Sequence, residues 1–239
     1  MFKRKRPQAK IFDSFDWWNK GCFLLQMTGD RCDYIESCIT RVFGKGALAQ
    51  QEILEIGCGG GLICQDLAQR KALMVGIDPS RNALAVARKH TQKSGFGQNV
   101  YYQQGYAEAL PYADGIFSVI VCLDVLEHVH NLPATIKEVA RVLAPGGVFV
   151  FDTINRTLLA RIILILYGEH FPSGGLVPGI HNYHGFIKPG ELRALLTANG
   201  LQVCELTGFM PRGLSHGHVK MGPGWFKSLS YVGYATKQR

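Results

Sequence analysis

The sequence of 239 residues is long enough for one large domain or two small ones. Hydrophobic residues make up 47% of it and charged residues 18%, a balance that excludes an intrinsically disordered chain. The formal net charge of +8 favours anionic partners but does not identify one. Four basic residues lie at positions 3–6, and we interpret them as a solvated terminus rather than an arm that binds lipid or nucleic acid.

The cysteines and the apolar runs bear on the cellular location. Seven cysteines are scattered without C-x-x-C spacing, their number is odd, and no apolar signal segment follows the basic start. This pattern predicts a cytoplasmic protein with reduced thiols. No run reaches the roughly 18 apolar residues that a membrane span needs, so we expect no transmembrane helix.

Strand and helix patterns alternate along the chain. Residues 53–56 are apolar and run into a glycine loop, and residues 62–70 have apolar side chains at helical spacing. The pattern then predicts a strand over 72–78, a helix over 79–95 and a strand over 99–105. A strand from 115 runs into polar residues, and a helix over 132–147 and a strand over 148–153 follow it. After a less regular stretch it predicts a helix over 188–200 and strands over 201–209 and 228–236.

Strands that are apolar throughout and separated by helices are typical of a parallel sheet buried on both faces. With right-handed crossovers, we predict an α/β fold: a doubly wound, Rossmann-like, seven-stranded, mostly parallel sheet with helices on both faces. Ligands of such sheets bind at the carboxyl ends of the strands, where Gly57, Asp78, Asp124 and Thr153 lie. We expect one domain, 1–239, with an N-terminal helical cap (1–48), a core (50–153), an insertion (154–190) and C-terminal strands (191–239).

The glycine loop indicates which ligand binds there. It reads G-C-G-G-G-L from Gly57, so Leu62 replaces the third glycine of the dinucleotide fingerprint, and no P-loop lysine follows. Glu55 would repel a pyrophosphate but attract an ammonium group, and Asp78 can accept both hydroxyls of a ribose. These features suit S-adenosylmethionine, a ribose-bearing ligand with a cationic end, better than a turn that needs glycine for its backbone alone.

Longer motifs carry a resemblance to a known family. In order, the core resembles class I S-adenosylmethionine-dependent methyltransferases in LEIGCGGG, VGIDPS, AEALPYADGIFSVIVCLDVLEHV and RVLAPGGVFVFDT. Outside it, the chain resembles the ubiquinone-biosynthesis O-methyltransferase family in WW, INRT (154–157), HNYHGFIKPGEL (181–192) and MGPGW (221–225). The resemblance implies methylation of a hydroxyl on a polyprenylated catechol or quinol.

The resemblance also implies roles for single residues. The glycine loop approaches the methionine end of the cofactor, Asp78 holds its ribose, Leu123 packs on its adenine, and Arg31 pairs with its carboxylate. For Arg31 the alternative is a surface arginine on a helix. Tyr106 stands where many relatives carry an acid, so Glu108 or backbone would contact the adenine amine. The full cofactor set is Arg31, Glu55, Gly57, Cys58, Gly59, Gly61, Asp78, Pro79, Ala107, Glu108 and Leu123.

The catalytic candidates are Asp124, Glu127 and His128, which at i, i+3 and i+4 would share one face of a helical turn. Such a trio can bind Mg²⁺ or Zn²⁺, and a metal lowers the pKa of a bound catechol. The family is thought to use an acid-x-x-Glu-His trio in this way, often with Glu at the position of Asp124. Two alternatives stay open: His128 acts directly as the base, or the trio is structural. His181 is a weaker second candidate.

The most apolar stretch outside the core is 156–171. We interpret it either as a buried core helix or as a lid that contacts the membrane and admits an apolar prenyl chain. With the basic start of the chain, the second interpretation predicts peripheral contact with anionic lipid at the inner face of the membrane. Alternative acceptors are a carbon, a nitrogen or a soluble phenol. The sequence shows no aromatic–basic stacking platform, so we expect no nucleic-acid partner.

Overall fold

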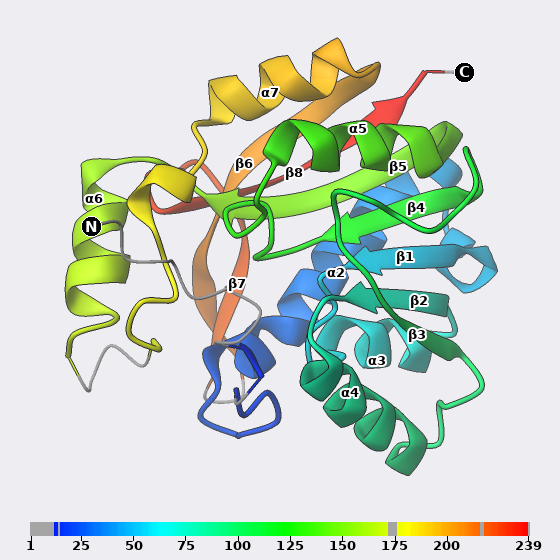
Figure 1. The fold of residues 1–239 in the computed structure, drawn as a ribbon, viewed down its shortest axis with the longest axis horizontal. Coiled ribbons are helices and arrows are strands. Elements are labelled where there is room, and N and C mark those ends of the chain that lie inside the picture. Colours follow the sequence, from blue (N-terminus) through cyan, green and yellow to red (C-terminus); the bar gives the residue numbers. More distant parts are fainter. Residues whose placement is uncertain (1–11, 14, 172–175, 216–217, 239) are drawn as a thin grey trace, which may run out of the picture.

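The computed structural model describes residues 12, 13, 15–171, 176–215 and 218–238; the basic cluster at 3–6 lies outside them. An eight-stranded sheet forms the centre, in the order β3-β2-β1-β4-β5-β8-β6-β7 (Figure 1). The parallel strands are β1 (Glu52–Ile56), β2 (Leu73–Asp78), β3 (Val100–Gln104), β4 (Phe117–Cys122) and β5 (Leu143–Ile154). The antiparallel strands are β6 (Leu201–Ser215), β7 (His218–Gly224) and β8 (Ser230–Lys237).

The predicted α/β class is confirmed, but the described chain has eight strands rather than seven. The expected strand 201–209 continues to Ser215 and pairs with β7, which places Pro211 opposite Met221 and Pro223 opposite Phe209. The stretch that forms this hairpin is rich in glycine and proline, a composition typical of loops. Pro223 is tolerated because β7 is an edge strand, and Pro211 because it lies beyond Gly208, where the pairing of β6 with β8 ends.

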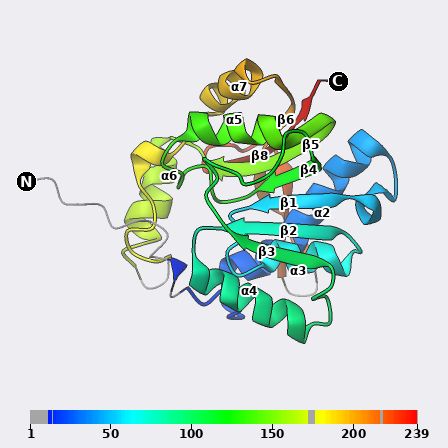
Figure 2. The same cartoon turned by 45° about the vertical axis from the view of Figure 1, so that its right-hand side comes forward.

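Helices cover both faces of the sheet, as predicted (Figure 2). One core cluster joins α2 (Phe23–Phe43), α3 (Leu62–Gln69) and α4 (Arg81–Lys93) to the strand residues that face them. A second joins α5 (Leu132–Val142) and α7 (Pro189–Ala198) to the opposite face. Neighbours on β1 divide between the clusters, since successive strand residues point to opposite faces. The fully apolar strands are therefore buried on both sides.

One predicted boundary moves. The helix expected over 132–147 ends at Val142, and β5 begins at Leu143. Pro145 explains the shift, because proline offers no N–H to a helix and disfavours the helical conformation of the residue before it. Gly146 follows with φ +77°, inside β5, where the pairing with β4 shifts its register between Leu143 and Val148.

The apolar stretch at 156–171 is not a buried core helix. It begins with α6 (Leu158–Ala160) and continues as a π-helical segment, η2 (Arg161–Tyr167). Ala160 packs with Ile154 and Phe186, whereas the outer face leaves Leu158, Ile162, Leu166, Tyr167 and Phe171 between 45% and 65% exposed. Within the described ranges, no helix is long and apolar enough to cross a bilayer.

Candidate functional site

A cavity of about 650 Å³ opens at the carboxyl ends of β1, β2, β4 and β5, the edge that the sequence predicts. Phe12, Phe15, Trp17, α2, the loop 176–181 and the β6–β7 hairpin complete its wall. Of the four strand-end residues, Gly57, Asp78 and Asp124 line the cavity, but Thr153 does not. Thr153 lies at the end of β5, as predicted, but its side chain points away from the cavity, because Asp152 and Ile154 line the cavity on either side of it.

The glycine loop adopts left-handed backbone at Gly57, Gly59 and Gly61, with φ of 74°, 49° and 80°. The Gly59 N–H donates to Asp78 Oδ2 at 2.9 Å, which ties the loop to the end of β2. Gly57 lines the cavity, whereas Gly59 and Gly61 lie behind its wall. They lie beneath Trp17 and Tyr102, respectively, and a β-carbon at either glycine would stand 2.4 Å from its neighbour.

The aromatic segment before α2 covers the glycine loop. Trp18 Nε1 donates to the Gly60 carbonyl at 3.0 Å, and the Trp18 indole stacks on His90 with ring centroids 4.3 Å apart. Ser80 Oγ donates to Asp13 at 2.5 Å, which fastens the start of the segment to α4. The sequence analysis assigned no site residue here, although the aromatic spacing in FDSFDWW marks the segment.

Two acids, Glu55 and Asp78, face the half of the cavity at the glycine loop. Glu55 is 4% exposed, and its Oε2 has no hydrogen-bond partner within the described residues. Burial raises the pKa of Glu55 to about 8, although Cys64 opposes the shift. Asp78 accepts the Gly59 N–H and, through Oδ1, the Ser80 N–H at 2.8 Å, while burial raises its pKa. Glu55 is therefore mainly protonated in the ligand-free site near neutral pH, and a cation bound beside it would favour its carboxylate form.

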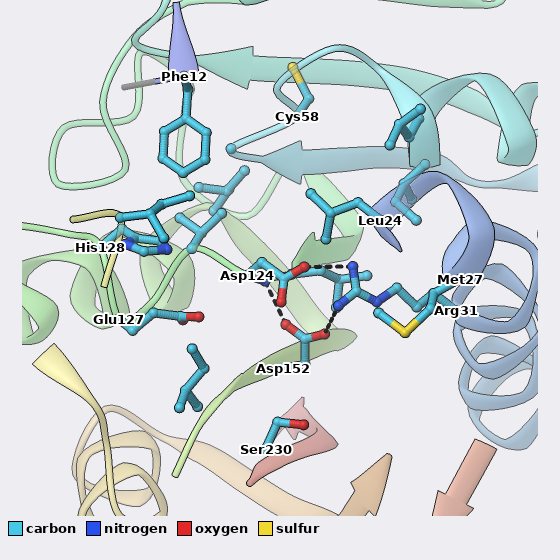
Figure 3. A pocket seen from close by; sticks show the side chains of 18 of the residues that line it. Phe12, Leu24, Met27, Arg31, Cys58, Asp124, Glu127, His128, Asp152 and Ser230 are labelled. Atoms are coloured by element: carbon cyan, nitrogen blue, oxygen red, sulfur yellow. Dashed lines mark hydrogen bonds and ion pairs between the residues drawn. The ribbon is translucent and has the colours of Figure 1, made fainter. Parts of the chain in front are cut away.

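Arg31 lies in the cavity wall and not on the surface. Its Nη1 is 2.6 Å from Asp124 Oδ2, and its Nη2 is 3.2 Å from Asp152 Oδ2 (Figure 3). The Asp124 N–H donates to Asp152 Oδ1 at 2.5 Å and closes the group. Arg31 Nε is buried without a hydrogen-bond partner in the described chain. Asp152 was not predicted as a site residue, although an acid at the end of an apolar strand is a recognisable signal.

The other predicted cofactor residues lie around the same cavity. Cys58, Pro79, Ala107, Glu108 and Leu123 all line the cavity. Glu108 Oε1 accepts the backbone N–H groups of His130 at 2.8 Å and Asn131 at 3.4 Å. Glu108 therefore organises the turn before α5.

The trio Asp124, Glu127 and His128 lies on a turn and not on a helix, so the prediction of one shared helical face is wrong. Asp124 has φ +54°, outside the helical range, because its N–H points to Asp152 and its carboxylate to Arg31. Glu127 accepts the Thr153 hydroxyl at 2.7 Å. Among the described residues, no three His, Cys, Asp or Glu side chains are arranged to hold a metal. This arrangement does not fit Mg²⁺ or Zn²⁺.

The far side of the cavity holds two histidines. The His128 ring lies 5.7 Å from Phe12 and 5.6 Å from His181, measured between centroids (Figure 3 shows the first pair). Burial, followed by His181, lowers the pKa of His128 to about 4. Burial also lowers the pKa of His181, against the opposing charge of Glu169. Both imidazoles are therefore neutral near neutral pH.

Comparisons with known proteins agree with this geometry. A family profile described as "Methyltransferase domain" matches residues 54–151. The ubiquinone biosynthesis O-methyltransferase of Coxiella burnetii (strain RSA 493 / Nine Mile phase I) is 34% identical over 210 residues, which cover 85% of each protein. The protein of the same name from Azoarcus sp. (strain BH72) is 36% identical over 197 residues, which cover 80% of each.

Solved structures share the fold at lower identity. Magnesium protoporphyrin IX methyltransferase from Synechocystis PCC 6803, with bound SAM, superposes with a TM-score of 0.63 at 18% identity and covers 99% of this chain and 100% of its own. PH0226 from Pyrococcus horikoshii OT3 gives 0.65 at 17% identity and covers both chains fully. The sequence relatives decide the family: this chain is an S-adenosylmethionine-dependent methyltransferase that belongs to the ubiquinone biosynthesis O-methyltransferases.

Proposed function

We propose that this enzyme methylates a hydroxyl of a polyprenylated catechol or quinol in ubiquinone biosynthesis. The names of the sequence relatives support this acceptor. The main support is the cavity, whose two halves differ. The half at the glycine loop is lined with acids, and the other half has two neutral histidines and apolar walls. S-adenosylmethionine supplies a methyl group on a positively charged sulfonium.

The acid-lined half fits that cofactor. Glu55 presents a buried carboxylate oxygen that would receive the ammonium group. Arg31 Nε is a buried donor that would bind the carboxylate, while Asp124 and Asp152 hold the guanidinium in place. Asp78 lies at the end of β2, where it would receive the ribose hydroxyls.

The other half fits an aromatic ring with an apolar tail. His128 lies between Phe12 and His181, and this stack of rings would orient a catechol in the cavity. Beyond it, the walls come from the insertion and the β6–β7 hairpin, with Leu164, Leu176, Val177, Ile180, Phe209, Met210, Met221 and Phe226. A closed apolar wall would exclude water from the ring and bury part of a prenyl chain.

The exposed face of α6 and η2 supports a contact with the membrane, where a prenylated acceptor would be dissolved. Ile162 and Leu166 lie on this face, next to the cavity residue Leu164. Arg161 adds a positive charge that favours anionic headgroups. The segment would then lie in the interface and guide the acceptor into the cavity.

The test is methyl transfer from S-adenosylmethionine to a short-chain prenylated catechol, compared with the same catechol without its chain. We expect turnover of both, with a lower KM for the prenylated acceptor because the apolar wall binds the chain. Exchange of Met210 for Gln should raise that KM and leave the KM of the chain-free catechol unchanged. Binding of S-adenosylhomocysteine without turnover of either catechol would refute the acceptor class and leave the family assignment intact.

A further inference from the structure

The insertion contains a carboxylate–histidine pair outside the predicted catalytic trio. His181 Nδ1 lies 3.0 Å from Glu169 Oε1, and the same oxygen accepts the His181 backbone N–H at 2.9 Å. Glu169 Oε2 accepts the Gly179 N–H at 2.6 Å. The Glu169 side chain is 2% exposed, so a buried carboxylate uses both oxygens to hold one short loop and one imidazole.

This contact fixes the tautomer of His181. A carboxylate oxygen accepts hydrogen bonds, so Nδ1 carries the ring proton and Nε2 of the neutral ring keeps a lone pair. Glu169 lies outside the cavity wall and His181 lies in it, so the Nδ1 edge faces the protein interior and Nε2 lies on the opposite edge. No residue of the described ranges hydrogen-bonds Nε2.

A buried acid behind an imidazole is the arrangement that orients a general base. His128 stands beside His181, and its ring packs against Phe12 and the face of His181. A proton accepted by His181 would be stabilised by the Glu169 carboxylate at 3.0 Å. Positive charge that develops on the His181 imidazole is therefore balanced by the Glu169 carboxylate.

We propose that His181, oriented by Glu169, is the base that takes the hydroxyl proton of the acceptor, while His128 orients its ring. This assignment rests on the proposed function. The acceptor O–H proton goes to Nε2, the oxygen forms a bond to the methyl group, and the methyl–sulfur bond breaks with its electron pair staying on sulfur. The products are an aryl methyl ether, a neutral thioether and a His181 imidazolium paired with Glu169. The imidazolium loses its proton to water after the products leave.

The test compares acceptors of different acidity. A base matters most for a phenol that is protonated in solution and least for a nitrocatechol that is already ionised. We expect His181→Gln to lower kcat/KM by about 100-fold or more for 4-methylcatechol and by less than about tenfold for 4-nitrocatechol. His184→Gln, an exchange of an exposed histidine nearby, should change neither. His128→Gln should lower kcat/KM by the same factor for both acceptors.

A second measurement reads the pair without turnover. In ¹⁵N spectra of histidine-labelled enzyme, we expect His181 of the wild type to carry its proton on Nδ1. In Glu169→Gln we expect a smaller fraction of this tautomer. Calorimetry with S-adenosylhomocysteine should give unchanged affinity for both variants. Equal losses with the two catechols in His181→Gln, or a proton on Nε2 in the wild type, would overturn the assignment. If the wild type turns over no catechol, the proposed acceptor class is wrong. The ¹⁵N measurement of the His181 tautomer then still tests whether Glu169 orients His181.

Discussion

The indole of Trp17 lies directly against the backbone of Gly59, where a β-carbon would stand 2.4 Å from the ring. We therefore expect Gly59→Ala to displace Trp17 and weaken the binding of S-adenosylhomocysteine at least tenfold in calorimetry. Gly95→Ala is the control, because Gly95 also has positive φ, +82°, but nothing lies within 4 Å of its β-carbon position. That control should cost only the strain of the backbone, about 1–2 kcal/mol of unfolding free energy. Similar ligand affinities in the two variants would contradict the role of Trp17.

Glu55 makes the stability of the ligand-free enzyme depend on pH. Its folded-state pKa of about 8 exceeds the ordinary value of 4.5, so the folded protein binds more protons than the unfolded chain between these values. The contribution of Glu55 is fully present below pH 4.5 and is lost as pH rises through 8, an effect on the order of 4 kcal/mol. In urea titrations, Glu55→Gln should gain stability relative to wild type as pH rises across this window. Glu52→Gln, an exchange of an exposed residue on the same strand, should show no such trend.

Arg31 balances the buried carboxylate of Asp152 and the partly exposed carboxylate of Asp124. Arg31→Met would leave Asp124 and Asp152 facing each other without their cation, and we expect a loss of about 3–5 kcal/mol of unfolding free energy. Adding Asp152→Asn should recover part of that loss, because it removes one of the two charges. Arg41→Met is the control on the same helix, since its pair with Glu205 is partly exposed and should contribute less than about 1 kcal/mol. No recovery in the double variant would show that the two acids do not repel each other.

The exposed apolar face of η2 should determine membrane binding. We expect Ile162→Gln/Leu166→Gln to lower binding to phosphatidylcholine–phosphatidylglycerol vesicles about tenfold or more in co-sedimentation, because each exchange removes apolar area from the contact. The control is Leu73→Gln/Ile116→Gln, which changes aliphatic residues of similar exposure in β2 and just before β4. A loss of equal size in both double variants, or none in either, would place the membrane contact elsewhere.

The cofactor half of the site could be predicted from sequence because its residues belong to short continuous segments. The glycine loop, Glu55 and Asp78 follow from strand ends and loop spacing, and all lie at the predicted edge of the sheet. Asp124 is different. Its distance from Glu127 and His128 along the chain suggests a helical face, but its backbone conformation depends on Asp152 and Arg31, which are remote in sequence.

The remaining errors share this cause. The β6–β7 hairpin has the composition of a loop and becomes a strand pair because β8 provides an adjacent ordered strand. Trp17 covers Gly59 through a contact across some forty positions of the chain, which no periodicity reveals. His181 and Glu169 are twelve residues apart in an irregular segment, so spacing gave no indication that they pair.

The position of β8 has a consequence for the order in which the enzyme can assemble. β8 is the last strand along the sequence, yet it lies inside the sheet and joins β5 to β6 by antiparallel pairing on both sides. During synthesis, the five parallel strands can pair as soon as β5 has emerged, whereas the β6–β7 hairpin has no place to dock until residues 230–237 are available. Since that hairpin forms one wall of the cavity, a nascent chain acquires its glycine loop long before it acquires a closed acceptor pocket.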